Sequence, residues 1–214
     1  MTSGLNYVLS VVIHMSKFIK NDTGIMGLTL SQIGLIIVTS ILLAAIFSIL
    51  FLNDWQRKAE LENITTSFST IVEAMDTRFF ENITKFYFPE KSYTYNVSLS
   101  TEYIILTANG NQNNKLSIKE QLIRKTWPRT SYHSWKTGEE LHNYCLYTYG
   151  HSGALTDPIS QADMDRLTIE RENASRTLAV TPVYIQKKNL TYIEKVIIHS
   201  DDTEKKEYIL VYQL

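Results

Sequence analysis

The sequence lacks a second cysteine, an excess of either charge, and any charged residue between Thr23 and Asn53. Because Cys145 is the only cysteine, an internal disulfide is excluded, and the thirteen tyrosines and eight phenylalanines must supply bulk for a core. The 21 basic and 22 acidic residues are interspersed, so no extended basic face is available for nucleic acid. With 20% charged and 44% hydrophobic residues, the 214-residue chain is expected to fold.

Catalytic motifs are also absent: the chain contains no Gly-rich phosphate loop, no His-Glu-x-x-His and no Gly-x-Ser-x-Gly. The one pairing that suggests chemistry is His142 with Cys145 on a predicted helix, with His151 just beyond. A thiol nucleophile or a metal site would need such neighbours. A buried free cysteine beside surface histidines explains the same residues, so we predict no enzyme activity, no catalytic residue, no metal and no cofactor.

The charge-free stretch from Thr23 to Asn53 covers 31 residues, and its densest part is Ile33 to Leu52. At a rise of 1.5 Å per residue this part spans about 30 Å, the thickness of the hydrocarbon core of a bilayer. A discarded secretory signal fits less well, because its apolar stretch has roughly 7 to 15 residues and ends at a small-residue cleavage site. The stretch therefore predicts a helix that can cross a membrane.

Six Asn-x-Ser/Thr acceptors for glycans occur in the chain, and five of them follow the apolar stretch. The first is Asn21, and the five candidates are Asn63, Asn82, Asn96, Asn173 and Asn189. Attachment of glycans would require an extracytoplasmic location for the chain after the apolar stretch. This distribution favours an outside C-terminal part, whereas the basic residues on the two sides of the stretch are nearly balanced.

Beyond Asp54, apolar residues recur every three or four positions, which predicts one stripe along a helix. The stripe consists of Leu61, Ile64, Phe68, Ile71, Val72, Met75, Phe79, Ile83 and Phe86. Because the first helix breaker is Pro89, we expect one continuous helix from about Leu30 to about Phe86, with two helices that bend near Asn53 as the alternative. Asn63 is expected to point away from the stripe and Asn82 to lie near its edge.

After Pro89 the pattern changes to the alternation typical of strands. Strands are predicted at Tyr93–Leu99, Glu102–Thr107 and around Leu116 and Ile118. Short helices are predicted from the Thr137 cap to Gly150 and from Asp157 through Ala174. A final meander is predicted with strands at 179–186, 191–199 and 207–213. The fold class is therefore α+β: a long N-terminal helix followed by a C-terminal antiparallel-sheet domain with short helices.

This architecture resembles that of type IV pilins and their archaeal relatives. The residues that carry the resemblance are Lys17 and Lys20 in a basic leader, Gly27 before the expected cut, Leu28 as the new N-terminus and Gln32 at the fifth mature position. The stretch "LSQIGLIIVTSILLAAI" is similar to the N-terminal signature of archaeal pilins. The resemblance covers about 30 residues and implies a class III signal, which is cut in front of the apolar helix by a prepilin peptidase.

The leader departs from the family pattern in one respect. Family leaders normally place basic residues directly before the glycine, but six residues separate Lys20 from Gly27, and Gly24 is a rival cut site. A start at Met15 instead of Met1 would give a leader of typical length and charge.

The resemblance implies a leader at 1–27, a transmembrane helix at 28–53, an amphipathic helix outside the membrane at 54–88 and an extracellular, glycosylated α+β domain at 89–214. The implied partners are the lipid bilayer, other pilin-like subunits or envelope proteins, and the prepilin peptidase. Gln32 could bond the free amine of Leu28 but not neutralise it, which favours an accessory pilin-like protein or one that stays in the membrane. The alternatives are a single-pass anchored ligand-binding or sensor domain and, resting on Cys145 and His142, an anchored enzyme.

Overall fold

The computed structural model describes residues 30–109, 115–128 and 137–214. The chain divides into two compact units, with Leu52 as the last residue of the first and Asn53 as the first residue of the second. Helix α2 (Leu30–Asp76) contributes to both units and includes Asn53 without interruption. The elements that follow in the second unit are β1 (Asn82–Phe86), β2 (Tyr95–Leu99), β3 (Tyr103–Asn109), β4 (Lys115–Gln121), β5 (Thr126–Pro128), α3 (Gly138–Tyr149), α4 (Gln161–Val180), β6 (Val183–Ile185), β7 (Thr191–His199) and β8 (Lys205–Gln213).

The fold is α+β, with a long N-terminal helix and a C-terminal domain built on antiparallel sheets, as the sequence predicts. The described strands form two four-stranded sheets, one in the order β1-β7-β8-β5 and one in the order β4-β3-β2-β6. All pairings are antiparallel except that of β5 with β8.

The second half of α2 forms the main core with both sheets. Its buried side chains follow the predicted spacing of three and four residues: Leu61, Ile64, Phe68, Val72 and Met75. They pack in one cluster with Tyr95 and Leu106 of one sheet and with Ile193 and Val211 of the other. The amphipathic stripe therefore attaches the helix to the domain.

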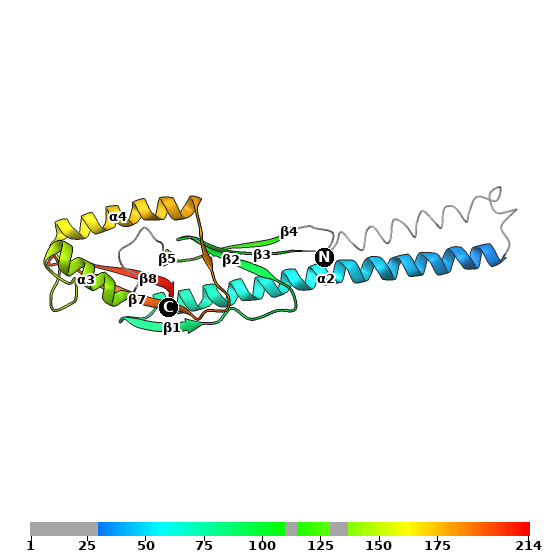
Figure 1. Ribbon diagram of the computed structural model, residues 1–214, viewed down its shortest axis with the longest axis horizontal. Helices are drawn as coiled ribbons and strands as arrows, with labels where there is room; N and C mark the ends of the chain where they lie inside the picture. Colours follow the sequence, from blue (N-terminus) through cyan, green and yellow to red (C-terminus); the bar gives the residue numbers. More distant parts are fainter. Residues whose placement is uncertain (1–29, 110–114, 129–136) are drawn as a thin grey trace. The chain divides into compact units, whose positions relative to one another are not determined.

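The opposite face of the first sheet is covered by α3 and α4. Along β8, Ile209 and Val211 belong to the α2 core, whereas Tyr208, Leu210 and Tyr212 belong to a second cluster with the helices. This alternation is the period of two that is expected of a strand buried on both faces. Figure 1 shows α4 and the C-terminal half of α2 on opposite sides of the strands.

The predicted continuation of α2 to Phe86, and of the amphipathic helix to residue 88, is wrong. The helix ends at Asp76, and Asn82–Phe86 forms β1, paired with β7. Phe79, which the helical stripe would bury, is 89% exposed. The physical cause is Lys195 of β7, whose buried ammonium donates hydrogen bonds to the carbonyl of Asp76, which the helix end leaves unsatisfied, and to the carbonyl of Arg78 in the segment that follows.

Two further predictions need correction. α4 starts at Gln161 with Ser160 as its cap, rather than at Asp157, because the Ser160 hydroxyl accepts from the backbone N–H of Asp163. The helix then continues to Val180, into the predicted strand. The last three strands do not form one meander, because β6 pairs with β2 whereas β7 pairs with β8.

Helix α3 lies as predicted. The Thr137 hydroxyl accepts from the N–H of Glu140, and Gly150 ends the helix with a φ of 84°, where glycine is favoured. At its start, Gly138 approaches β7 so closely that an added Cβ would lie 2.5 Å from Glu194 Oε1. The sequence therefore placed both ends of this element correctly.

Candidate functional site

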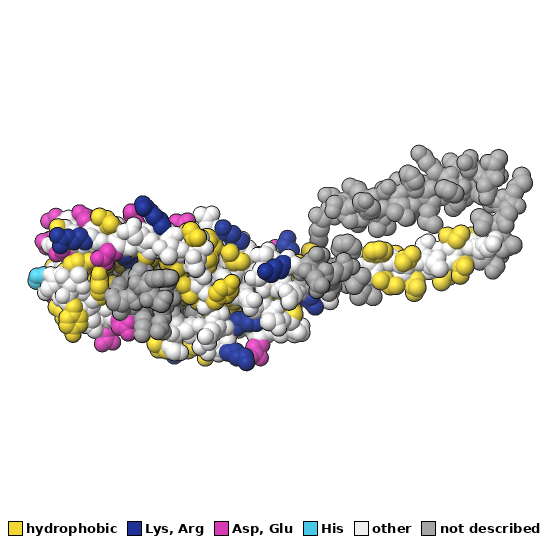
Figure 2. Space-filling view, turned by 45° about the horizontal axis from the view of Figure 1, so that its top comes forward, with side chains coloured by type: hydrophobic (Ala, Val, Ile, Leu, Met, Phe, Trp, Pro, Cys, Tyr) yellow, Lys and Arg dark blue, Asp and Glu magenta, His cyan; other side chains and the backbone are white. Residues whose placement is uncertain are grey.

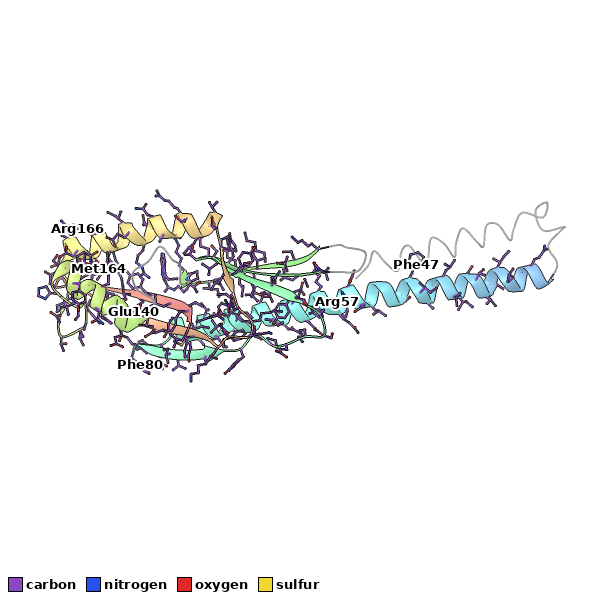
Figure 3. All side chains as sticks on the ribbon, viewed as in Figure 1. Phe47, Arg57, Phe80, Glu140, Met164 and Arg166 are labelled. Atoms are coloured by element: carbon purple, nitrogen blue, oxygen red, sulfur yellow. The ribbon has the colours of Figure 1, made fainter. Side chains whose placement is uncertain are left out.

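The candidate site is the apolar half of α2 that belongs to the first unit, from Gln32 to Leu52. The large side chains that the structure describes in this half are exposed, as Leu35, Leu42 and Phe47 illustrate. Phe47 is 58% exposed and projects from the helix (Figure 3). In Figure 2, hydrophobic side chains follow this part of the helix, whereas charged side chains are spread over the second unit. Within the described residues, one helix is long and apolar enough to cross a membrane, and it is α2.

Two hydroxyl side chains within this half, those of Thr39 and Ser48, bond carbonyls of the helix itself. The Thr39 hydroxyl donates to the Leu35 carbonyl at 2.9 Å, and the Ser48 hydroxyl donates to the Ala44 carbonyl at 2.8 Å. A hydroxyl that bonds the preceding turn does not need water. These residues are therefore compatible with an apolar solvent, where every polar group must be satisfied internally.

The first turns of α2 within the second unit contact the sheet β4-β3-β2-β6 and the segment just before β2. The Arg57 guanidinium donates to the Asn109 carbonyl at 3.1 Å and lies 5.3 Å from the centre of the Tyr93 ring. The Tyr93 hydroxyl donates to Glu60, which also pairs with Lys91 at 3.2 Å. Burial and the neighbouring Glu60 carboxylate raise the pKa of Tyr93 to about 12. Arg57 therefore marks where α2 becomes part of the domain (Figure 3).

The predicted processing residues are described only in part. Gly27, Leu28 and the rival Gly24 lie outside the described residues. Gln32 is an exposed residue in the first turn of α2, upstream of the dense apolar part. The structure thus locates the predicted partner of the N-terminal amine but not the amine.

The glycan acceptors differ in accessibility. Asn63 on α2, Asn96 on β2 and Asn173 on α4 are exposed, whereas Asn82 and Asn189 are partly buried. The Asn189 amide nitrogen donates to the Gln186 side chain at 3.1 Å, so the atom that would carry a sugar is already bonded. Asn21 lies outside the described residues. Accessibility therefore favours Asn63, Asn96 and Asn173.

The pair of Cys145 and His142 is not arranged for thiol chemistry. Cys145 is buried in the second core, and burial raises the pKa of its thiol to about 11, so the reactive thiolate is disfavoured at neutral pH. The His142 Nδ1 lies 2.8 Å from the Ser152 carbonyl oxygen, and Nε2 lies 3.1 Å from Glu81. Both ring nitrogens therefore bond groups other than the thiol, while His151 bonds Asp157 at 2.7 Å.

Glu81 is a residue that the sequence did not single out. Its carboxylate accepts from the backbone N–H of Ile197, at the part of β7 beyond its pairing with β1, and it also bonds His142. It therefore joins the segment after α2 to both β7 and α3. No local sequence pattern distinguishes it from other surface glutamates.

Comparison of the chain with family models, curated proteins and solved structures gives no match.

Proposed function

We propose that this chain is a non-enzymatic, pilin-like cell-envelope protein that is anchored in the membrane, or assembled with other subunits, through the first half of α2. In this proposal residues 89–214 form most of an extracellular domain that carries glycans. The observation that carries the proposal is the division of α2: exposed apolar side chains from Ile33 to Phe47 and at Leu52, followed by a single buried stripe from Leu61 to Met75.

The two halves of α2 suit two different surroundings. A helix that is apolar on all sides is stable in lipid or among other apolar helices, whereas a helix with one apolar stripe is stable on the surface of a domain. A pilin-like subunit needs both kinds of helix surface, because its helix is first inserted in the membrane and can then pack against identical helices. The bonded hydroxyls of Thr39 and Ser48 are consistent with such surroundings.

The side chain of Gln32 helps to distinguish a major filament subunit from an accessory subunit. If the mature chain begins at Leu28, the amide of Gln32 can accept a hydrogen bond from the new amine but cannot neutralise its charge. Burial of a charge without an opposite charge is costly. We therefore favour an accessory subunit, or one that remains in the membrane, over a major filament subunit.

The test is substitution of the proposed cut site. Gly27→Leu should block cleavage by a co-expressed prepilin peptidase and leave a precursor larger by the leader, while membrane insertion is unchanged because the span is unchanged. Gly24→Leu is the matched control and should be processed normally. Mass spectrometry of the membrane-extracted protein measures both results.

A native protein that begins near Asn53, or that keeps Met1 or Met15, would contradict the proposal. In either case the single-pass anchored ectodomain would be the better account of the chain.

A further inference from the structure

Strand β1 (Asn82–Phe86) lies at an edge of the sheet β1-β7-β8-β5. It pairs with β7 on one side, and no strand of the described residues pairs with its other side. Figure 1 shows β1 along the lower rim of the second unit. Such an edge presents backbone N–H and C=O groups that a further strand can bond, and proteins usually protect it with charges, proline or a bulge. In β1 the one such feature is Lys85, because the strand has no other charge, no proline and a regular register with β7.

The side chains around β1 alternate between buried and exposed positions. Thr84 donates to the sulfur of Met75 at 3.3 Å, and Phe86 packs against Phe68 with ring centres 5.4 Å apart, so both face the core. The exposed positions are Phe79, Glu81, Ile83, Lys85 and Tyr87. Their three apolar members are 89%, 46% and 66% exposed, in that order. The exposed row is therefore apolar, acidic, apolar, basic and apolar.

The order of this exposed row is complementary to itself. When two such strands lie side by side and antiparallel with Ile83 opposite Ile83, residues equally distant from Ile83 face each other. Glu81 then faces Lys85 of the second copy, and Phe79 faces Tyr87 of the second copy. Opposite charges and aromatic pairs in facing positions stabilise neighbouring strands. Because a two-fold axis makes each of these contacts twice, a second copy of this chain suits the open edge.

The two charges of the exposed row are available for such a contact. The Lys85 ammonium lies 5.8 Å from the centre of the Tyr192 ring, and the ion pairs found among the described residues do not include it. The Glu81 side chain is 50% exposed, and its contacts with the Ile197 N–H at 2.9 Å and with His142 at 3.1 Å both use Oε1. Its other oxygen, Oε2, can therefore accept a hydrogen bond from an ammonium of the second copy.

We propose that two copies of this chain associate through β1, antiparallel about a two-fold axis at Ile83, so that the sheet β1-β7-β8-β5 continues from one copy into the other. This contact goes beyond the proposed function and does not depend on how the chain is anchored or processed. The axis is perpendicular to the sheet, so the segments Leu61–Met75 of the two copies, which pack on a face of that sheet, run in opposite directions. The tests therefore use the full chain in detergent micelles, where each copy can take either direction.

The first test is disulfide formation at the axis. In a Cys145→Ser background, Ile83→Cys places one thiol opposite the same thiol of the second copy. Facing Cβ atoms of paired strands lie roughly 4.5–5.5 Å apart, close to the separation of a disulfide. We expect mild oxidation with copper phenanthroline to give a disulfide-linked dimer on a non-reducing gel.

The matched controls test the register. Tyr87→Cys alone places the two thiols about 26 Å apart along the strands, at about 3.3 Å for each of eight residues, so it should give no dimer. Phe79→Cys alone should give none for the same reason. A mixture of the two variants, both in the Cys145→Ser background, should form a mixed disulfide, because Phe79 faces Tyr87 across the axis.

The second test measures association without a cross-link. Ile83→Lys brings two ammonium groups together at the axis, and Lys85→Glu brings a carboxylate opposite Glu81. We expect each to raise the dissociation constant of the dimer at least tenfold, measured by analytical ultracentrifugation with correction for bound detergent. Lys188→Glu is the matched control, an exposed lysine in the turn before β7, and should leave the constant unchanged. Near-UV circular dichroism verifies that each variant is folded.

Three results would overturn the proposal: no dimer from oxidised Ile83→Cys, equal cross-linking of Tyr87→Cys alone, or unchanged association of the folded Ile83→Lys and Lys85→Glu variants. Association through the apolar half of α2, which the proposed function allows, would persist in these variants and is thereby distinguished from pairing of β1. The outcome for Gly27→Leu bears on the proposed function alone, since the leader takes no part in this contact.

Discussion

Lys195 is the residue on which the end of α2 depends. Its side chain is 1% exposed, yet its ammonium pairs with Glu207 at 2.8 Å and bonds the carbonyls of Asp76 and Arg78. A buried charge is tolerated when it is paired and its hydrogen bonds are made. One side chain of β7 thus satisfies the end of a helix that lies 119 residues earlier in the chain.

Replacement of Lys195 by methionine should therefore destabilise the domain. We expect Lys195→Met to lower the free energy of unfolding by about 3 kcal/mol at neutral pH, because two carbonyls and the Glu207 carboxylate lose their shared donor. Denaturant unfolding followed by tryptophan fluorescence measures the change. Lys188→Met, at an exposed position, is the control and should change the free energy little.

The effect of Lys195→Met should also depend on pH. Burial raises the pKa of Glu207, but the hydrogen bonds and charges of Lys195 and Lys205 outweigh burial and lower it overall. A lowered folded pKa gives stability that is present above the unfolded value and is lost as the pH falls through the folded value. The cost of Lys195→Met should shrink below about pH 4.5. An equal cost at acid and neutral pH would refute this role of the ion pair.

At the scale of elements, the sequence predicts what is specified locally. Thr137 and Gly150 delimit α3, because a hydroxyl cap and a left-handed glycine act within one turn of the helix. The strand at Thr191–His199 likewise has the bounds that the sequence predicts. The end of α2 and the partner of β6 could not be predicted, because they depend on Lys195 and on β2, far away in the sequence.

The same limit applies to the candidate sites. The apolar half of α2 is visible as a charge-free run, because it lies in one continuous segment. The role of Glu81 could not be foreseen, because its partners Ile197 and His142 lie far away in the sequence and it resembles an ordinary surface glutamate. Arg171 likewise resembles a surface cation in the sequence, but it is buried on α4 against the rings of Trp127 and Tyr208.

The two halves of α2 should respond differently to truncation of a phenylalanine. Phe68 is fully buried and contacts the rings of Phe86 and Phe88, so Phe68→Ala should lower the free energy of unfolding of the domain by about 3–5 kcal/mol. Phe47→Ala removes the same side chain from the exposed half and should leave this free energy unchanged. Unfolding of the full chain in micelles, followed by near-UV circular dichroism, measures both.

A comparable loss from Phe47→Ala would mean that the first half of α2 belongs to the core of the domain. The assignment of different surroundings to the two halves of α2, on which the proposed function rests, would then be wrong.

At the scale of the whole molecule, the two units require different surroundings. The described part of the first unit offers exposed apolar side chains, whereas the second unit has two buried cores and charged side chains on its surface (Figure 2). The exposed acceptors Asn63, Asn96 and Asn173 all belong to the second unit. If the apolar half spans a membrane, the second unit lies wholly on one side of it, and the proposed function requires the outer side.

The single cysteine allows this orientation to be tested directly. Cys145 is buried, and its raised pKa makes the thiol unreactive, so the native chain should not react with a membrane-impermeant maleimide. In a Cys145→Ser background, Asn96→Cys places a thiol on the exposed side of β2. We expect the reagent to label this variant in intact cells to the same extent as in permeabilised cells, because the thiol faces the medium. Labelling only after permeabilisation would place the second unit in the cytoplasm, where neither glycans nor assembly with outer subunits is accessible to it.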